Sequence, residues 1–272
     1  MIKLFVTDLD GTLLGVDHYI KNEDIDALKR MIEQGTPLAV ASGRMDHEIA
    51  EVLKRVGVNG HRVSQNGAYV FNNQDAPIHE KIFEDELAKR IIDTIDDEPM
   101  IKTVSTADQT FTKESNEFLK LISEQMFHDI LVTPDLNDKV GKSVKPSKIT
   151  LHGKEEDVIK VAKKVKETFG EEVDSFISHE TCVDIMPKSI NKQSGLHKLI
   201  EGLEIKPEEI ACVGDSFNDV SMFEMTPHSY VMSTAHEDVK SHAGTVVAHV
   251  HEAIEDLDKK GLLTKKEQAA DI

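Results

Sequence analysis

Two aspartates, Asp8 and Asp10, stand one residue apart at the end of an apolar run near the start of the chain. The run, residues 2–6, predicts a buried parallel strand. In extended backbone the side chains at positions i and i+2 point the same way, so both carboxylates can face one small volume. They would repel each other there unless a cation or a shared proton lay between them. A hard divalent cation, above all Mg²⁺, satisfies that demand.

Gly11 follows directly and allows the chain to turn where a side chain would clash. A D-x-D-G segment is also typical of a calcium-binding loop. The residues after Gly11 do not continue as an EF-hand, which would place further oxygen ligands through Val16 and end in a glutamate. A plain exit from a strand into a turn is the other structural interpretation of the segment.

Polar residues follow two other apolar runs that also predict buried parallel strands. Residues 37–41 lead into Ser42, and residues 210–213 lead into a Gly-Asp pair that ends at Asp215. Parallel strands end at the same edge of a sheet, and ligands bind in the crevice beyond the carboxyl ends of the strands. We therefore expect the Ser42 hydroxyl to meet the carboxylates of Asp8 and Asp215 at this edge.

Lys192 lies at the start of a helix predicted from Asn191. The free N–H groups and the dipole at a helix N-terminus favour anions, and a lysine ammonium is a compact charge that suits phosphate. A solvated side chain is the default interpretation for any one lysine. The position at the helix start distinguishes Lys192 from its neighbour Lys188.

The elements that must position these residues alternate between helix and strand. The pattern predicts a helix that starts at Asn22 or Asp24 as its N-cap, then a strand over 37–41 and a helix over 46–55. Two strand–helix units in a row predict an α/β fold with a doubly wound, Rossmann-like parallel sheet. Residues 63–71 then predict a strand, a turn and a returning strand.

From residue 83 the pattern changes to a mixture of helices and antiparallel strand candidates. We expect helices over 84–95, 114–126 and 155–169, and strands over 101–105, 148–152, 173–178 and 181–186. This rhythm predicts an α+β domain over residues 83–187. It would be inserted into an α/β domain formed by residues 1–82 and 188–272.

Composition excludes several classes of partner. The 272 residues suit one large domain or two ordinary ones, and a net charge of −18 speaks against nucleic acid and anionic membranes. No stretch approaches the roughly 20 apolar residues of a membrane span. Because an apolar run starts at residue 2, we expect no signal peptide, and two cysteines make no disulfide framework. We expect a cytoplasmic protein.

Four segments, in order, resemble the motifs of the haloacid dehalogenase (HAD) superfamily: Asp8-Leu9-Asp10-Gly11-Thr12, Ser42-Gly43-Arg44, Lys192, and Gly214-Asp215-Ser216-Phe217-Asn218-Asp219. The resemblance implies that Asp8 is the nucleophile and Asp10 the general acid/base. It implies a phosphate site formed by Leu9, Ser42, Gly43, Lys192 and Asn218. It also implies a Mg²⁺ site formed by Asp8, Asp215 and Asp10, the last through its backbone carbonyl, with Asp219 in support.

The spacing of the motifs indicates which branch of the superfamily the chain resembles. Only one helix and one strand fit between Thr12 and Ser42, and the large insertion lies between Ser42 and Lys192. The chain therefore resembles the C2B-capped, Cof-type (type IIB) phosphatases, in which the inserted α+β domain is a cap that sets substrate specificity. Ser189 and Gln193 depart from the pattern, because glycines are common at those positions in Cof-type relatives.

The resemblance implies Mg²⁺-dependent hydrolysis of small phosphorylated metabolites, such as sugar phosphates or phosphorylated cofactors. Asp8 would accept the phosphoryl group as an aspartyl phosphate, and Asp10 would first give a proton and then take one. Two alternatives stay open. One is a phosphomutase of the same capped type, and the other is a non-catalytic phosphate-binding regulator, against which the intact Asp8 and Asp10 argue. The sequence does not predict the oligomeric state.

Overall fold

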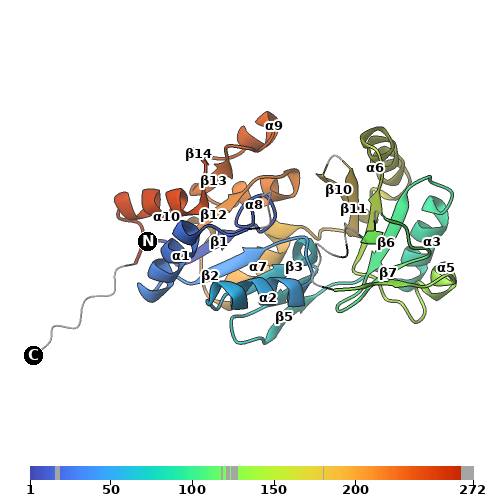
Figure 1. Cartoon of the computed structure of the whole chain (residues 1–272), viewed down its shortest axis with the longest axis horizontal. Helices are drawn as coiled ribbons and strands as arrows, with labels where there is room; N and C mark the ends of the chain where they lie inside the picture. Colours follow the sequence, from blue (N-terminus) through green and yellow to red (C-terminus); the bar gives the residue numbers. More distant parts are fainter. Residues whose placement is uncertain (16–18, 118, 121–122, 124–127, 180, 265–272) are drawn as a thin grey trace, which may run out of the picture.

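The computed structural model describes residues 1–15, 19–117, 119–120, 123, 128–179 and 181–264. Two β-sheets, one of eight strands and one of six, carry helices on their faces and lie side by side along the long axis of the molecule (Figure 1). The eight-stranded sheet is built from both ends of the sequence and the six-stranded sheet from the middle.

The eight-stranded sheet has the order β14-β13-β12-β1-β2-β3-β4-β5. It is parallel from β14 to β3, and β4 and β5 add two antiparallel strands at one edge. The strands are β1 (Leu4–Thr7), β2 (Leu38–Ala41), β3 (His61–Ser64), β4 (Tyr69–Phe71), β5 (Pro77–Glu80), β12 (Ile210–Gly214), β13 (Ser229–Met232) and β14 (Thr245–Val247).

Both faces of this sheet are buried, because alternate residues of each strand point to opposite sides. In β1, Phe5 packs in the apolar cluster with α1 (Asn22–Glu33), α2 (Asp46–Val56) and α10 (Val250–Lys259). Leu4 and Val6 pack on the other side with α7 (Lys192–Gly202), α8 (Val220–Phe223) and α9 (Glu237–Lys240). Short 3-10 turns complete this part: η1 (Gln65–Gly67), η2 (Pro207–Glu209) and η3 (Phe217–Asp219).

The six-stranded sheet has the order β10-β11-β9-β6-β7-β8 and is antiparallel except for the pair β7–β8. Its strands are β6 (Ile101–Ser105), β7 (Thr110–Thr112), β8 (Ile130–Val132), β9 (Lys148–His152), β10 (Val173–His179) and β11 (Cys182–Pro187). The helices are α3 (Asp85–Ile95), α5 (Leu136–Lys139) and α6 (Glu155–Phe169).

This second sheet has one apolar and one polar face. Ile149 and Leu151 of β9 and Ile185 of β11 pack in one cluster with the inner sides of α3 and α6. The residues between them in each strand, such as Thr150 and Asp184, point to the opposite face. That polar face is directed away from the helices of its own sheet.

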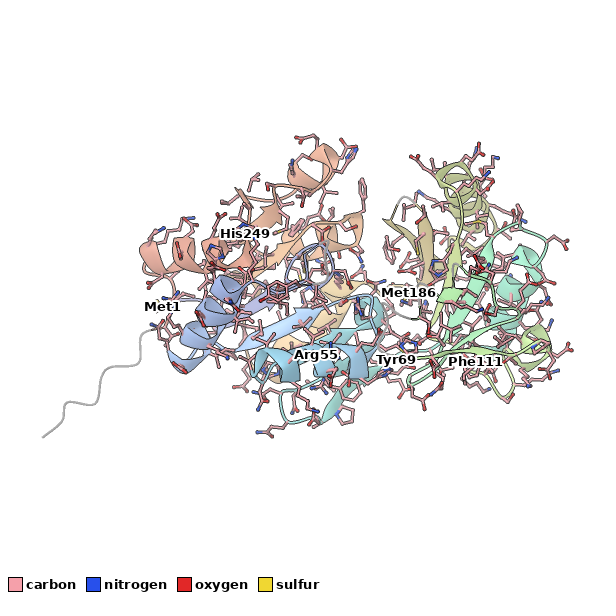
Figure 2. All side chains as sticks on the ribbon, in the orientation of Figure 1. Met1, Arg55, Tyr69, Phe111, Met186 and His249 are labelled. Carbon is pink, nitrogen blue, oxygen red and sulfur yellow. The ribbon has the colours of Figure 1, made fainter. Side chains whose placement is uncertain are left out.

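The expected α/β fold, a doubly wound parallel sheet with an inserted α+β segment, is confirmed. Where the two sheets approach, Tyr69 packs with Met186 and Ile190 in a small apolar cluster (Figure 2). We propose the boundaries 1–82 and 188–272 for the core domain and 83–187 for the cap domain, because all strands of the second sheet lie within 83–187.

Several local expectations differ from the structure. Lys21, without a side-chain cap, precedes α1, and the carboxylate of Asp24 instead accepts hydrogen bonds from the backbone and ring nitrogens of His251, both at 2.8 Å. The strand β5 was not expected from the sequence. The helix predicted over 114–126 lies partly outside the described residues, and the tail after residue 264 lies wholly outside them. Within the described residues, every helix is too short or too polar to cross a membrane.

Candidate active site

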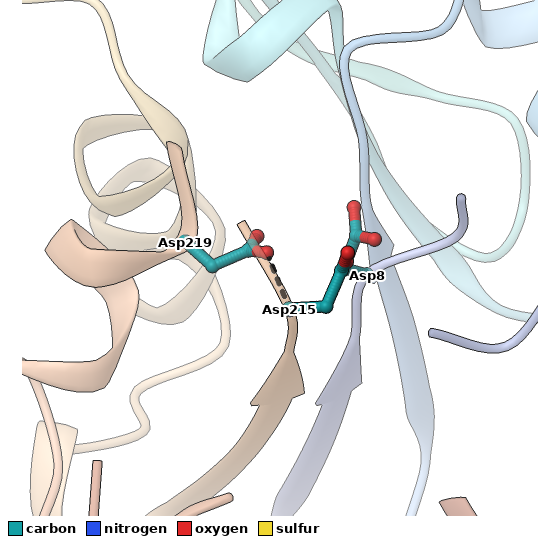
Figure 3. Close-up of side chains that lie close together, drawn as sticks. All are labelled: Asp8, Asp215 and Asp219. Carbon is teal, nitrogen blue, oxygen red and sulfur yellow. Dashed lines mark hydrogen bonds between the residues drawn. The ribbon is translucent and has the colours of Figure 1, made fainter. Parts of the chain in front are cut away.

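Three carboxylates meet beyond the carboxyl ends of neighbouring strands. Asp8 follows β1 and Asp215 follows β12, which pairs with β1 in parallel, and the Asp8 N–H donates to Val213 O at 2.9 Å. Asp219 reaches the same place from the turn after β12 (Figure 3). One oxygen from each of the three carboxylates lies within 4.8 Å of the others. The predicted meeting of Asp8 with Asp215 is therefore present.

The loop after β1 is shaped to admit Asp215. Gly11 has a φ of +83°, and a Cβ atom at this position would lie 2.4 Å from Asp215 Oδ2. Only glycine combines this left-handed backbone with such a close approach. The next residue, Thr12, donates its hydroxyl to Asp215 Oδ1 at 2.9 Å. The D-x-D-G-T segment thus contacts and positions the carboxylate of Asp215, which lies about two hundred residues away in the sequence.

Asp219 is fixed by hydrogen bonds through both of its carboxylate oxygens. Oδ2 accepts from the backbone N–H groups of Asp215 and Ser216, each at 2.9 Å, and one of these bonds is the dashed line in Figure 3. Oδ1 accepts from the ammonium of Lys192 at 2.6 Å. Because its oxygens are occupied in this way, Asp219 suits a supporting role better than direct contact with a ligand.

Lys192 brings an ammonium group into this cluster from the N-terminus of α7. Asn191 caps that helix by accepting from Ser194 N at 2.8 Å. The Lys192 side chain is 1% exposed, and its Nζ lies 2.5 Å from Asp8 Oδ1 and 2.6 Å from Asp219 Oδ1. A buried ammonium held between two carboxylates cannot be a solvated surface lysine, so the default interpretation of Lys192 is excluded.

The cluster carries more negative than positive charge, and the pKa values of its groups reflect this. Burial is the largest cause that raises the pKa of Asp8 well above its ordinary range, and Asp219 and Asp215 raise it further, against the effect of Lys192. Burial and the charge of Asp219 raise the pKa of Asp215 to about 6. The pKa of Lys192 is raised despite its burial, because both Asp219 and Asp8 stabilise the ammonium.

These oxygens fit a hard divalent cation. Asp8 and Asp215 offer carboxylate oxygens within reach of one another. Burial, and after it the neighbouring carboxylates, raise the pKa values of both groups, so a cation would favour their ionised forms. Carboxylate oxygens are the protein ligands that Mg²⁺ prefers. Asp8 and Asp215 are therefore the side chains that could hold such an ion.

The carboxylate of Asp10 lies apart from this cluster. Arg44 holds it through two hydrogen bonds, Nε to Oδ2 at 2.8 Å and Nη2 to Oδ1 at 2.7 Å. The Asp10 side chain is 44% exposed, whereas that of Arg44 is 11% exposed. The predicted metal contact through the backbone carbonyl of Asp10 remains a prediction.

Arg44, in the loop before α2, is in turn placed by Glu48 in the first turn of that helix. The Glu48 side chain is fully buried, accepts from Met45 N at 2.8 Å and contacts Arg44 Nη1 at 3.3 Å. His128, beyond β7 in the sequence, approaches the same carboxylate to 3.7 Å. Burial opposes the ionised form of Glu48, but the hydrogen bonds with His128 and Met45 lower its pKa below the ordinary value. Sequence reasoning named Arg44 only as part of the Ser42-Gly43-Arg44 motif and missed Glu48, although the two residues lie four positions apart in the sequence.

The predicted phosphate-binding residues lie around the same edge. Ser42 is 1% exposed, and its hydroxyl accepts from Arg44 N at 3.1 Å. The Oδ1 atom of Asn218 is buried and makes no hydrogen bond with the described residues. Leu9 is fully buried in the apolar core, so only its backbone could reach a phosphate. These positions fit the predicted roles, which remain predictions.

A strained turn joins this edge to the second sheet. Gln65 and Asn66 both have left-handed backbone, with φ of 46° and 54°, a conformation that costs free energy for residues other than glycine. Asn66 Oδ1 accepts from Asn218 Nδ2 at 3.1 Å, and Asn66 Nδ2 donates to Asp184 Oδ2 at 3.1 Å. The Asn66-Gly67 dipeptide predicts a turn, but nothing in the sequence reveals this link.

Comparison with known proteins shows the family. The family of haloacid dehalogenase-like hydrolases matches residues 5–254 of the chain. The chain belongs to this family. The expected HAD membership is therefore confirmed, and this HAD-like hydrolase is an enzyme.

Individual relatives and solved structures agree with this assignment. The HAD-like chain is 26% identical over 243 residues to a protein of Serratia proteamaculans named HMP-PP phosphatase, covering 89% of this chain and 87% of the relative. A crystal structure from Thermotoga maritima is 29% identical, with a TM-score of 0.80, and covers 94% of this chain and 97% of that one.

The type IIB expectation is confirmed at the level of the fold. A structure described as a HAD subclass IIB sugar phosphatase has a TM-score of 0.82 to the present structure. The match covers 96% of this chain and 100% of the other at 23% identity. The two chains thus share the core and the inserted sheet.

Proposed function

We propose that this HAD-like hydrolase is a Mg²⁺-dependent phosphatase of small phosphorylated metabolites. The single observation that carries the proposal is the buried cluster of Asp8, Asp215 and Lys192 at the carboxyl edge of the parallel sheet. A nucleophilic carboxylate next to an ammonium and a cation-binding carboxylate is the arrangement that phosphoryl transfer needs. Relatives named as phosphatases support the proposal.

The residues divide the reaction between them. An Asp8 oxygen attacks phosphorus, the bond to the leaving oxygen breaks, and Asp10 gives that oxygen its proton. A water molecule then attacks the phosphoryl group on Asp8 while Asp10 takes the proton of the water, which frees inorganic phosphate and restores Asp8. Bound Mg²⁺, held by Asp8, Asp215 and the backbone of Asp10, would supply charge neutralisation for the phosphoryl oxygens.

The remaining residues bind and orient the phosphoryl group. The ammonium of Lys192 would neutralise charge on the phosphoryl oxygens. The Ser42 hydroxyl, the backbone N–H groups of Leu9 and Gly43, and the amide N–H of Asn218 would donate hydrogen bonds to the same oxygens. Lys192 also positions the Asp8 carboxylate through an ion pair, since its Nζ lies 2.5 Å from Asp8 Oδ1. Arg44 orients the Asp10 carboxylate.

The test is phosphate release from p-nitrophenyl phosphate and from a panel of metabolite esters, with Mg²⁺ or with EDTA. We expect Asp8→Asn to abolish release, because an amide cannot act as the nucleophile. Asp26→Asn, an equivalent change at an exposed site on α1, should retain full activity. Full activity of Asp8→Asn, or an inert wild-type enzyme across the whole panel, would reject the proposal.

A trapping experiment separates hydrolysis from transfer to another hydroxyl. Rapid acid quench of the enzyme with radiolabelled ester should capture phosphate on Asp8. Chase with water alone should release all of the label as inorganic phosphate. Transfer of the label to an added sugar alcohol in preference to water would instead support the phosphomutase alternative.

A further inference from the structure

A histidine of the cap domain lies against a buried carboxylate of the core domain. The Nδ1 atom of His128 is 3.7 Å from Glu48 Oε1. The hydroxyl of Thr110 on β7 holds the other ring nitrogen, Nε2, at 3.0 Å. Among the described residues, no other hydrogen-bond partner approaches Nδ1. The ring is therefore oriented so that Nδ1 faces the Glu48 carboxylate.

Helix capping accounts for only one of the two carboxylate oxygens of Glu48. As the third residue of α2, Glu48 accepts the hydrogen bond of Met45 N through Oε2 at 2.8 Å, as in a capping box. Oε1 instead faces Arg44 Nη1 at 3.3 Å and His128. The Glu48 side chain is fully buried, and a buried carboxylate needs polar partners for both oxygens. Arg44 and His128 are these partners for Oε1.

The charges around Arg44 do not balance without a further donor. Its guanidinium binds two carboxylates, that of Asp10 through Nε and Nη2 and that of Glu48 through Nη1. One positive charge cannot neutralise both, and Glu48 is fully buried, whereas Asp10 is partly exposed to solvent. Burial raises the pKa of Glu48, but His128 is the largest of the causes that lower it below its ordinary value. The histidine therefore helps to keep Glu48 ionised.

The neighbours of the ring also indicate which nitrogen carries a proton. Nδ1 of His128 faces an ionised carboxylate, which only accepts hydrogen bonds, so Nδ1 must carry a hydrogen. The Thr110 hydroxyl can donate to Nε2 while it accepts from the Ser105 hydroxyl at 3.2 Å. This arrangement gives a neutral ring with its N–H directed at Glu48, so the contact does not require a protonated imidazolium.

We propose that His128 is a positioning residue for Asp10, on which it acts from the cap domain through Glu48 and Arg44. This inference rests on the proposed phosphatase function and goes beyond it by adding a residue of the cap to the acid–base chemistry of the core. His128 fixes Glu48 Oε1, Glu48 fixes the guanidinium of Arg44, and Arg44 holds both oxygens of Asp10. Asp10 then meets the leaving oxygen and the attacking water in one orientation.

The first test is the kcat for phosphate release from p-nitrophenyl phosphate with Mg²⁺. His128→Phe keeps a ring but loses the N–H, and it should lower kcat by about 3- to 10-fold with little change in KM. This split is expected because Asp10 takes part in the chemical steps and not in substrate binding. His128→Asn should retain at least about half of the wild-type kcat, since its amide N–H can replace that of Nδ1.

A double-mutant cycle with Arg44→Met tests whether the two residues act through the same group. If His128 acts through Arg44, the double variant should have the kcat of Arg44→Met alone, because that variant has already lost the contact with Asp10. Independent effects would multiply, and the kcat of the double variant would then be a further 3- to 10-fold lower, roughly the factor for His128→Phe alone. That result would overturn the inference.

A matched control is His242→Phe on the surface of the core domain. The His242 side chain is 45% exposed and lies 3.4 Å from Glu224, so this variant should keep the wild-type kcat and KM. Urea unfolding of each variant verifies that a lower kcat is not a loss of folded protein. A higher KM with unchanged kcat in His128→Phe would contradict the inference, because the ring would then only help to seat the cap.

Thr110→Val offers a second route if His128→Phe does not fold. It removes the hydroxyl that holds Nε2 of His128 and leaves the ring in place. We expect kcat to fall by a smaller factor, about two- to threefold, with KM unchanged. A wild-type kcat in this variant, together with a wild-type kcat in a folded His128→Phe or His128→Leu, would reject the inference.

A measurement without substrate separates this inference from the proposed function. The Nε–H of Arg44 donates to Asp10 Oδ2 at 2.8 Å, and in a ¹⁵N-labelled sample its resonance is identified by its absence from Arg44→Met. Its hydrogen exchange with solvent should be at least about threefold faster in His128→Phe than in wild type, and unchanged in His242→Phe. Unchanged exchange in His128→Phe would reject the inference even in an active phosphatase. Faster exchange in a protein that hydrolyses no ester would support the contact and reject only the phosphatase proposal.

Discussion

The charge imbalance at Asp215 predicts an unusual dependence of stability on pH. Its pKa in the folded chain is raised from 3.8 to about 6, chiefly by burial and by Asp219. A folded-state pKa above the unfolded value means that the ionised form is penalised on folding. This penalty is fully present above pH 6 and disappears as the pH falls from 6 toward 4. At about 1.4 kcal/mol per pH unit, the difference of about two units corresponds to about 3 kcal/mol.

The perturbation that isolates this penalty is Asp215→Asn, which keeps an oxygen for the hydrogen bond from Thr12. Urea unfolding with EDTA should show the variant more stable than wild type by about 2–3 kcal/mol at pH 7.5. The difference should shrink toward zero at pH 4.5, where Asp215 is protonated in the folded wild type.

Mg²⁺ should remove most or all of this difference at pH 7.5. A cation at 100 times its dissociation constant stabilises the folded state by about 3 kcal/mol, and wild type should gain this because the ion removes the penalty on Asp215. The variant should gain much less. The reasoning is refuted if wild type and variant keep the same stability difference at both pH values, or if Mg²⁺ stabilises them equally.

Three further predictions follow from single contacts. Arg44→Met should lower kcat about tenfold with little change in KM, because Asp10 loses its bidentate partner; steady-state kinetics on p-nitrophenyl phosphate decide, and an unchanged kcat counts against the role. Ser189 has a left-handed backbone with φ of 63°, which glycine adopts at lower free-energy cost. Ser189→Gly should therefore raise the free energy of unfolding by about 0.5–1 kcal/mol in a urea titration, and a lower value would contradict this. Gly11→Ala should weaken Mg²⁺ binding in a calorimetric titration at least tenfold, since the added methyl would collide with Asp215; wild-type affinity would refute the steric argument.

The sequence predicted the parts of the site that depend on strand order. Asp8, Ser42 and Asp215 each follow a short, wholly apolar run, and such runs form the buried parallel strands whose ends share one edge. Lys192 was predicted as an anion-binding residue from its position at the start of a helix. Asp8, Asp215 and Lys192 meet at this edge. Ser42 follows the neighbouring strand β2, and its contact with the carboxylates stays a prediction.

Contacts between side chains far apart in the sequence could not be predicted in the same way. Arg44 meets Asp10, and Asn66 meets Asp184, only because the folded chain brings their strands and loops together. Periodicity gives the face of an element but not its partner across a gap. The same limit explains the N-terminus of α1, where Asp24 is withdrawn from capping by His251.

Residues on the two faces of the second sheet are constrained in different ways. Ile149, Leu151 and Ile185 are tied to the helices behind them, so they can change only within the volume that packing allows. Lys148 and Asp184 lie on the other side of the same strands and do not belong to that apolar cluster. Substitutions on the front of the sheet can therefore change its polar surface while the packing of the scaffold behind it stays as it is.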